Sequence, residues 1–229
     1  SNNIYNSLLA TTPPPELKIV PDLAKSWEVL DEGRTYVFHL HEGVTFHDGT
    51  DFDAQAAKWN IDRIIDPEVK SWIRPYYEDI EQVEAVDKYT LRIRMKEPSG
   101  ALPLALGGYF QGILMTSPKA FETYGQDWLR HPVGTGPFKF KEWLPGERVI
   151  LERNPNYWQY DKNGTQLPYL DTLIVSYAPD MDQMVLRFKQ GQADAFIRPR
   201  PDDVPGLRDG EKAGDYTLHD VGVGEGGNL

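Results

Sequence analysis

The chain has 229 residues, 40% of them hydrophobic, with 24 Lys and Arg against 35 Asp and Glu and no cysteine. This composition predicts a soluble globular protein rather than a fibrous, disordered or membrane-spanning one, and the formal net charge of −11 argues against nucleic-acid binding. Without cysteine the chain has no disulfide, no Cys-ligated zinc and no cysteine nucleophile.

Turn signals divide the first part of the chain. The proline run at residues 11–15 predicts a loop before residues 17–20. A turn at residues 31–33 separates residues 26–30 from residues 35–41, in which polar and apolar side chains alternate. This arrangement predicts a β-hairpin.

The hydrophobic period changes after this hairpin. From Ala57, apolar residues recur at i, i+4, i+7 and i+8, as on one face of a helix. Asp53 precedes the run as a candidate N-cap, and Pro67 ends it. An amphipathic helix is therefore expected here.

Two more hairpins are predicted in the middle of the chain. Residues 83–86 and 90–95 alternate around one turn, and residues 138–144 and 148–152 around another. Between the hairpins, a proline and a glycine bracket a short helix at residues 119–124.

The last third of the chain has a different pattern of predicted secondary structure. A strand at residues 172–178, a helix with an apolar face from Met181 and a strand at residues 194–197 form a βαβ pattern, which predicts a parallel sheet. A proline-rich loop is expected at residues 198–206 and another strand at residues 216–221.

Three histidines raise the question of a metal site. His39 and His41 stand at i and i+2 of a predicted strand, on one face, and His47 with Asp48 follows closely. The alternative is that the first two lie opposite the apolar face, in solvent, and that His47 precedes a turn. We favour the alternative and expect no metal and no cofactor.

Other motif matches are incomplete. Gly222, Gly224 and Gly227 have the spacing of a dinucleotide fingerprint, but no helix or later acidic residue follows them. Residues 161–165 resemble a calcium loop with its glycine misplaced, and the carboxylates of residues 78–84 are expected to form a solvated acidic face. No catalytic signature is present, so we expect no enzyme.

Aromatic residues are abundant, with 6 Trp, 12 Tyr and 9 Phe. Most are expected to pack a core, but aromatics beside glycines can form the wall of an organic-ligand cleft. Tyr109 and Phe110, in the glycine-containing residues 107–112, are the best candidates.

Three stretches of the sequence carry a family resemblance. They are PDLAKSWEVLDEGRTYVFHLHEGVTFHDGTDFDAQAAKWNIDRI at residues 21–64, HPVGTGPFKF at residues 131–140 and LERNPNYW at residues 151–158. In order and spacing they resemble the bacterial extracellular solute-binding proteins of family 5, the dipeptide-, oligopeptide- and nickel-binding receptors of ABC importers.

The resemblance implies a mixed α/β (α+β) fold, periplasmic-binding-protein-like type II, of which this chain forms part of lobe I. Residues 1–29 would begin the ligand-binding lobe after a missing leading strand. Residues 30–160 would form a hairpin-rich α+β subdomain. Residues 161–229 would return to the ligand-binding lobe as its βαβ part, cut before lobe II.

The function implied by the resemblance is capture without catalysis. Two lobes would close around a peptide or similar small solute outside the cytoplasmic membrane, and the closed receptor would deliver it to the permease subunits of an ABC importer. The location would be periplasmic or extracellular, with a lipid anchor on the full-length protein left open. The ligand-binding candidates in this chain are Tyr5, Asn6, Tyr109, Phe110, Gly134, Thr135, Gly136, Glu225, Gly226, Gly227 and Asn228.

Several alternatives stay open. The Gly134-Thr135-Gly136 run, flanked by prolines, is also explained by a tight turn that leads into a strand. A signalling or chaperone-like module could use the same fold to bind a solute without import. A hydrolase is disfavoured because no nucleophile and base are recognisable. The chemical identity of the solute is not encoded in these patterns.

Overall fold

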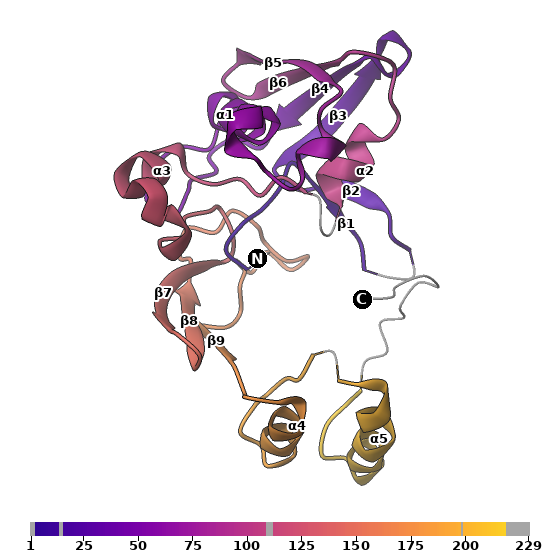
Figure 1. Ribbon diagram of the computed structural model, residues 1–229, viewed down its shortest axis with the longest axis vertical. Coiled ribbons are helices and arrows are strands. Elements are labelled where there is room, and N and C mark those ends of the chain that lie inside the picture. Colours follow the sequence, from indigo (N-terminus) through magenta and orange to yellow (C-terminus); the bar gives the residue numbers. More distant parts are fainter. Residues whose placement is uncertain (1–2, 14–15, 109–111, 198, 219–229) are drawn as a thin grey trace. The chain divides into compact units, whose positions relative to one another are not determined.

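The computed structural model describes residues 3–13, 16–108, 112–197 and 199–218 (Figure 1). By its internal contacts the chain divides into two units. Unit 1 comprises Ser1–Phe140 and Leu151–Leu173, and unit 2 comprises Lys141–Ile150 and Ile174–Leu229. In the part of the chain described, no helix combines the length and apolar character needed to cross a bilayer.

Unit 1 contains a four-stranded antiparallel sheet in the order β3-β4-β6-β5. The register places Trp27 opposite Phe38, and Phe38 in turn opposite Leu91. Two of the predicted hairpins are thereby confirmed, and the turn of the first places Gly33 at φ 94°, where glycine is favoured. The strands are β3 (Ala24–Leu30), β4 (Thr35–Leu40), β5 (Ile80–Asp87) and β6 (Thr90–Met95).

Helix α1 (Ala54–Ile65) packs against β5 and β6, as Figure 1 shows. Its predicted N-cap is confirmed, because the Asp53 side chain accepts a hydrogen bond of 2.9 Å from the backbone N–H of Ala56. The predicted apolar face is buried at Ala57 and Ile61. The helix therefore covers one face of the sheet with the residues that the 3.6-residue period selects.

The core of unit 1 lies between this sheet and the segments that cover it. Alternate residues of β4 point inward, as predicted for this strand. Full burial of a large apolar side chain contributes roughly 1.5–3 kcal/mol. The largest fully buried side chains are Tyr36, Tyr77, Phe38, Phe46, Phe52, Leu8, Leu9, Leu23, Leu40, Ile61, Leu91 and Ile93.

Smaller elements complete unit 1. Strands β1 (Leu9–Thr11) and β2 (Ile19–Pro21) form a two-stranded antiparallel sheet, and α2 (Leu102–Gly107) packs on both. The predicted short helix is confirmed as α3 (Pro118–Tyr124), capped by the Ser117 side chain. The described part of unit 1 also has four 3-10 helices, η1 (Asp31–Gly33), η2 (Pro67–Val69), η3 (Arg74–Tyr76) and η4 (Gly125–Arg130).

A second sheet has the order β7-β8-β9. Its first two strands, β7 (Phe138–Leu144) and β8 (Arg148–Arg153), confirm the third predicted hairpin. The third is β9 (Thr172–Ser176). The N–H of Arg153 donates to the Asp171 carbonyl and that of Tyr177 to the Glu147 carbonyl, both at 2.8 Å, so β9 runs antiparallel to β8.

One strand predicted for unit 2 is wrong, and another can be compared only over its first half. Residues 194–197 are not a strand, so the βαβ unit with its parallel sheet does not form among the described residues. A strand needs a neighbour for its backbone hydrogen bonds, and Ile197 is instead 81% exposed. The strand expected at residues 216–221 is absent over 216–218, and its remainder lies outside the described residues.

The proline-rich loop is also a wrong prediction, because most of it is helical. It contains η5 (Pro201–Asp203) and the start of α5 (Val204–Ala213), whose Pro205 lies in the first turn, where proline needs no hydrogen-bonded N–H. Gly214 ends the helix at φ 83°. Leu207 is buried, and its carbonyl accepts a 2.8 Å hydrogen bond from the Tyr216 hydroxyl.

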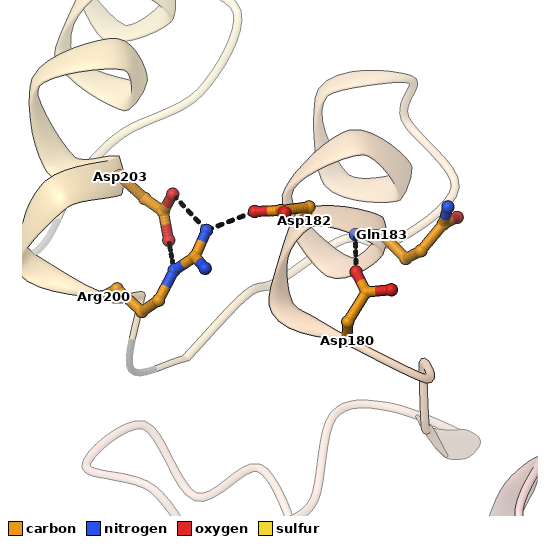
Figure 2. Close-up of polar contacts among 5 residues, drawn as sticks. All are labelled: Asp180, Asp182, Gln183, Arg200 and Asp203. Carbon is orange, nitrogen blue, oxygen red and sulfur yellow. Dashed lines mark hydrogen bonds and ion pairs between the residues drawn. The ribbon is translucent and has the colours of Figure 1, made fainter.

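Helix α4 (Met181–Lys189), predicted from its apolar face, is linked to η5 by an ion-pair cluster (Figure 2). The Arg200 guanidinium donates to Asp203 at 2.8 Å and also bonds Asp182 on α4. The two carboxylates raise the pKa of Arg200 above its ordinary value, mainly through these hydrogen bonds. Asp180 caps the helix by accepting from the N–H of Gln183 at 2.8 Å.

Candidate functional site

A cavity of ≈ 470 Å³ lies wholly within unit 1. Its wall is drawn from the segment after residue 3, from β1 and the end of β2, from the glycines at and after the end of α2, and from residues 157–159. Three aromatic side chains, Tyr5, Trp72 and Tyr157, share this wall with polar groups. An apolar wall with a few polar groups is the usual make-up of a small-molecule site.

A second concavity, of ≈ 450 Å³, lies between α1 and β5. Three of its four charged side chains are paired, Lys58 with Asp62 and Glu84 with Arg92. No large aromatic side chain is among its described lining residues. We therefore regard it as a solvated groove and consider the aromatic cavity as the candidate site.

The predicted residues Tyr5 and Asn6 line the cavity, and Asn6 connects its wall to distant parts of the chain. The Asn6 amide nitrogen donates to Asp22 at 3.0 Å, and its side-chain oxygen accepts from the Thr135 hydroxyl at 3.1 Å. Its backbone carbonyl accepts from Met115 at 2.9 Å. The sequence separations of these bonds mean that tertiary structure alone assembles this wall.

Gly134 and Gly136 lie against the segment that carries Tyr5, rather than among the described residues of the cavity wall. A Cβ atom at Gly134 would stand 2.2 Å from the Ile4 carbonyl oxygen, and one at Gly136 would stand 2.5 Å from the Ile4 carbonyl carbon. The Gly136 N–H donates to that Ile4 oxygen at 2.9 Å. Glycine is thus required here for close backbone approach.

His47 helps to hold the same turn. Its Nε2 lies 2.9 Å from the Gly136 carbonyl oxygen, and its Nδ1 accepts from the Gly134 N–H at 3.4 Å. These partners require the neutral tautomer with hydrogen on Nε2. Burial lowers the pKa of His47, which favours the same neutral form. The side chain therefore supports the cavity wall from outside.

The other histidines of the metal hypothesis have separate partners. His39 Nε2 lies 2.8 Å from a Glu28 carboxylate oxygen, and the His41 ring packs on Trp158 at 4.7 Å between centroids. Throughout the ranges that the structure describes, no group of three or more His, Asp or Glu side chains is placed to hold a metal ion.

Asp22 is the buried carboxyl of the cavity, 9% exposed. Its Oδ1 accepts from Asn6 and its Oδ2 accepts from the Ser7 N–H, each at 3.0 Å. Burial raises the pKa of Asp22 to about 6, against the lowering effect of these two hydrogen bonds. A carboxyl with this pKa carries a poorly solvated negative charge at neutral pH.

The two tyrosines of the wall remain protonated. Burial raises the pKa of Tyr5 to about 12, with Arg63 and a hydrogen bond with Thr116 acting in the opposite direction. Burial likewise raises the pKa of Tyr157 to about 12. Both phenols are therefore neutral hydrogen-bonding groups, and neither is a nucleophile at neutral pH.

Arg63 on α1 lies near Tyr5 but outside the described cavity lining. Its guanidinium carbon stands 5.5, 5.3 and 4.9 Å from the ring centroids of Trp59, Phe121 and Trp128. Contacts of this length are cation–π interactions. The aromatic residues of this part of the fold thus hold a cation, as core packing rather than as a ligand wall.

The remaining predicted site residues lie outside the described residues. They are Tyr109, Phe110, Glu225, Gly226, Gly227 and Asn228. Sequence reasoning missed Asp22, Trp72 and Tyr157. Trp72, a tryptophan in a stretch without strand or helix period, was the one detectable signal. Asp22 and Tyr157 carry no signal that separates them from structural residues.

Comparisons with known proteins agree on one class. The family model for bacterial extracellular solute-binding proteins, family 5 middle, matches residues 18–224. The glutathione-binding protein GsiB of Escherichia coli O1:K1 is 35% identical over 199 residues, covering 86% of this chain and 37% of that protein.

Solved structures show the same likeness. The periplasmic binding protein DppA from Helicobacter pylori, in complex with the peptide STSA, matches with a TM-score of 0.75 and 27% identity, covering 90% of this chain and 43% of that one. NikZ from Campylobacter jejuni, in complex with Ni(L-His), matches with a TM-score of 0.73 and 28% identity, covering 84% of this chain and 37% of that one. This chain therefore spans less than half the length of these relatives.

Proposed function

The chain belongs to the bacterial extracellular solute-binding proteins of family 5, and on that premise we propose that it contributes one wall of the solute site in a receptor of an ABC importer. The solute is a peptide or a similar small organic molecule. The receptor captures it outside the cytoplasmic membrane and delivers it, chemically unchanged, to the permease subunits.

The cavity of unit 1 is the observation that carries this proposal. Tyr5, Tyr157 and Trp72 offer aromatic surface for desolvating an organic solute, while Asp22 and Gln159 offer polar partners for its ends. Related proteins are described as binding glutathione, a peptide or a nickel–histidine complex, which favours a solute with amino-acid chemistry.

The mechanism follows from differential binding. A solute that contacts two walls favours the conformation in which both surround it, and a permease that recognises this conformation receives only loaded receptor. One wall alone supplies part of the contact area. We therefore expect this chain to bind its solute weakly, with a Kd on the order of 1 mM, equivalent to about −4 kcal/mol.

The test is a titration of the ¹⁵N-labelled chain with tetra-alanine, followed by NMR. The backbone amides of Ser7 and Gly108 in the cavity wall should shift saturably, and the peptide should be recovered intact. Ala10→Trp, which places a large side chain in the cavity wall, should abolish the shifts. Ala101→Trp, at an exposed position outside the described lining, should leave them unchanged.

Two results would contradict the proposal. Shifts that persist in the Ala10→Trp variant would show that the peptide binds elsewhere. Cleavage of tetra-alanine that is retained through purification would indicate a hydrolase instead of a binding protein.

A further inference from the structure

Among its described residues, the cavity wall carries a negative charge and no positive one. Asp22 is its single charged residue among the lining positions that the structure describes, and no Lys, Arg or His side chain accompanies it there. Among these described lining residues, an anionic group entering the cavity would therefore meet a carboxylate and no cation.

A cation that acts on one residue of the cavity wall, Arg63, is already held elsewhere. Arg63 influences Tyr5, but its guanidinium lies among the rings of Trp59, Phe121 and Trp128. Its Nε is buried and has no hydrogen-bond partner among the described residues. The aromatic cage keeps this charge out of the described wall, so it does not offset the polarity that Asp22 gives the cavity.

Asp22 has acceptor capacity left for a ligand. Each carboxylate oxygen receives one hydrogen bond from the protein, one from Asn6 and one from Ser7. An ionised carboxylate offers about four acceptor sites, so about two are unused. Burial of its charge is unfavourable without a positive partner, and the raised pKa of Asp22 agrees with the absence of such a partner among the described residues.

Trp72 adds a second contact for a cation. It lies between η2 and η3, lines the cavity and is 71% exposed, although tryptophan is the largest apolar side chain. No ring or cation contact of Trp72 is present among the described residues, and its high exposure leaves the side chain accessible to a ligand. Ammonium groups bind preferentially over the face of tryptophan.

We propose that this cavity selects the cationic, ammonium-bearing end of the solute, with Asp22 accepting its hydrogen bonds and Trp72 covering it, and that it disfavours a carboxylate. This inference rests on the proposed function, because it assigns an orientation to a solute held in the same cavity. The solute's carboxylate, if it has one, is directed away from this wall.

Two dipeptide derivatives of matched size test the assignment. Alanyl-alanine amide carries an ammonium group and no carboxylate, whereas N-acetyl-alanyl-alanine carries a carboxylate and no ammonium group. In NMR titrations of the 229-residue chain, the Ser7 and Gly108 amides should give a Kd at least tenfold lower for the amide. The Trp72 indole N–H, assigned through Trp72→Phe, should shift with the amide alone.

Variants separate charge recognition from loss of structure. Asp22→Asn should weaken binding of the amide at least tenfold and leave the acetyl derivative unchanged or tighter. Because this change also disturbs the bond to Ser7, Trp72→Leu serves as a second variant at an exposed position and should weaken the amide several-fold. Trp143→Leu, an exposed tryptophan of unit 2, is the matched control and should have no effect.

The outcomes distinguish this inference from the proposed function. Equal or tighter binding of the acetyl derivative would overturn the charge assignment, while tetra-alanine binding at the cavity would still support the receptor. Binding of tetra-alanine without binding of the amide would also overturn it. If none of the three peptides shifts a cavity amide, both proposals fail.

Discussion

The two units bury their apolar side chains to very different extents. Unit 1 has a continuous core around β4, β6 and α1, in which Phe38 and Leu91 are fully buried. In the described part of unit 2, Leu207 is the single buried hydrophobic residue, while Ile174 and Ile197 are exposed. Burial of apolar surface is the dominant stabilising contribution to folding. The folded structures of the two units must therefore be stabilised by different interactions.

Local interactions contribute a larger share of the stability of unit 2. Its helices have an Asp180 N-cap, a Gly214 C-terminus and the Arg200 ion pairs (Figure 2). An N-cap contributes about 1 kcal/mol, and exposed ion pairs contribute little. We therefore expect backbone amides of α4 and α5 to exchange with solvent at lower opening free energy than those of β4 and β6.

The largest effect is expected from a cavity in the core of unit 1. Phe38→Ala should lower the free energy of unfolding by about 3–5 kcal/mol, since it removes buried apolar contacts and leaves a void. Ile197→Ala in unit 2 should change it by less than about 0.5 kcal/mol. Urea denaturation of both variants measures the difference, and similar losses would show that unit 2 has a comparable core.

Asp22 should give unit 1 an unusual dependence on pH. Its pKa of about 6 in the folded chain exceeds the ordinary value of 3.8, so the folded state binds more protons than the unfolded state between these values. The contribution of this group to stability is therefore full below pH 4 and is lost as the pH rises through 6. The loss amounts to up to about 3 kcal/mol.

Denaturation of the Asp22→Asn variant checks this sign. The slope of unfolding free energy between pH 4 and 6 should become flatter than in the unmodified chain. Asp202→Asn, an exposed carboxyl of unit 2, should keep the original slope. An unchanged slope in Asp22→Asn would show that burial does not raise the pKa of Asp22.

A smaller effect is expected where the chain needs glycine. Gly134→Ala should destabilise unit 1 by about 2 kcal/mol, because its Cβ would collide with the Ile4 carbonyl oxygen. Gly100→Ala, at a position with no atom within 4 Å of the added Cβ, should be nearly neutral. Equal thermal melting temperatures for the two variants would refute close approach as the reason for glycine.

The smallest effect should come from the ion-pair cluster of unit 2. Arg200→Ala should leave the melting temperature within experimental error, since Arg200 and Asp182 are exposed and exposed ion pairs contribute little. Faster hydrogen exchange in α4 is the expected sign of the lost bond to Asp182. Arg208→Ala, an exposed arginine on α5 without an ion pair in the described residues, is the control and should not accelerate exchange in α4.

Local patterns predicted the local structure well. The alternation around residues 31–33 and the spacing from Ala57 identify a hairpin and a helix because strand and helix periods are read within one segment. The prolines of residues 198–206 suggested a loop, yet proline in a first helical turn costs little and α5 forms. Residues 194–197 do not form a strand, because a strand needs a neighbouring strand for its backbone hydrogen bonds, and a local pattern does not show whether one is present.

The cavity was predictable only in part. Tyr5 and Asn6 were named through the family resemblance, whereas Asp22, Trp72 and Tyr157 come from segments far apart in the sequence. No periodic pattern brings such residues together. Their assembly depends on long-range hydrogen bonds, as between Asn6 and Thr135, and on glycines whose necessity is visible only in three dimensions.

The long-range hydrogen bonds of Asn6 and its neighbours have a consequence for biosynthesis. This residue and its Thr135 partner are 129 positions apart, and the Phe138 N–H donates to the Asn3 carbonyl. The earlier segment is translated long before the later one leaves the ribosome, at roughly 5–20 residues per second. For several seconds the segment that will form the cavity wall therefore lacks these hydrogen-bond partners, and its apolar residues stay exposed to solvent.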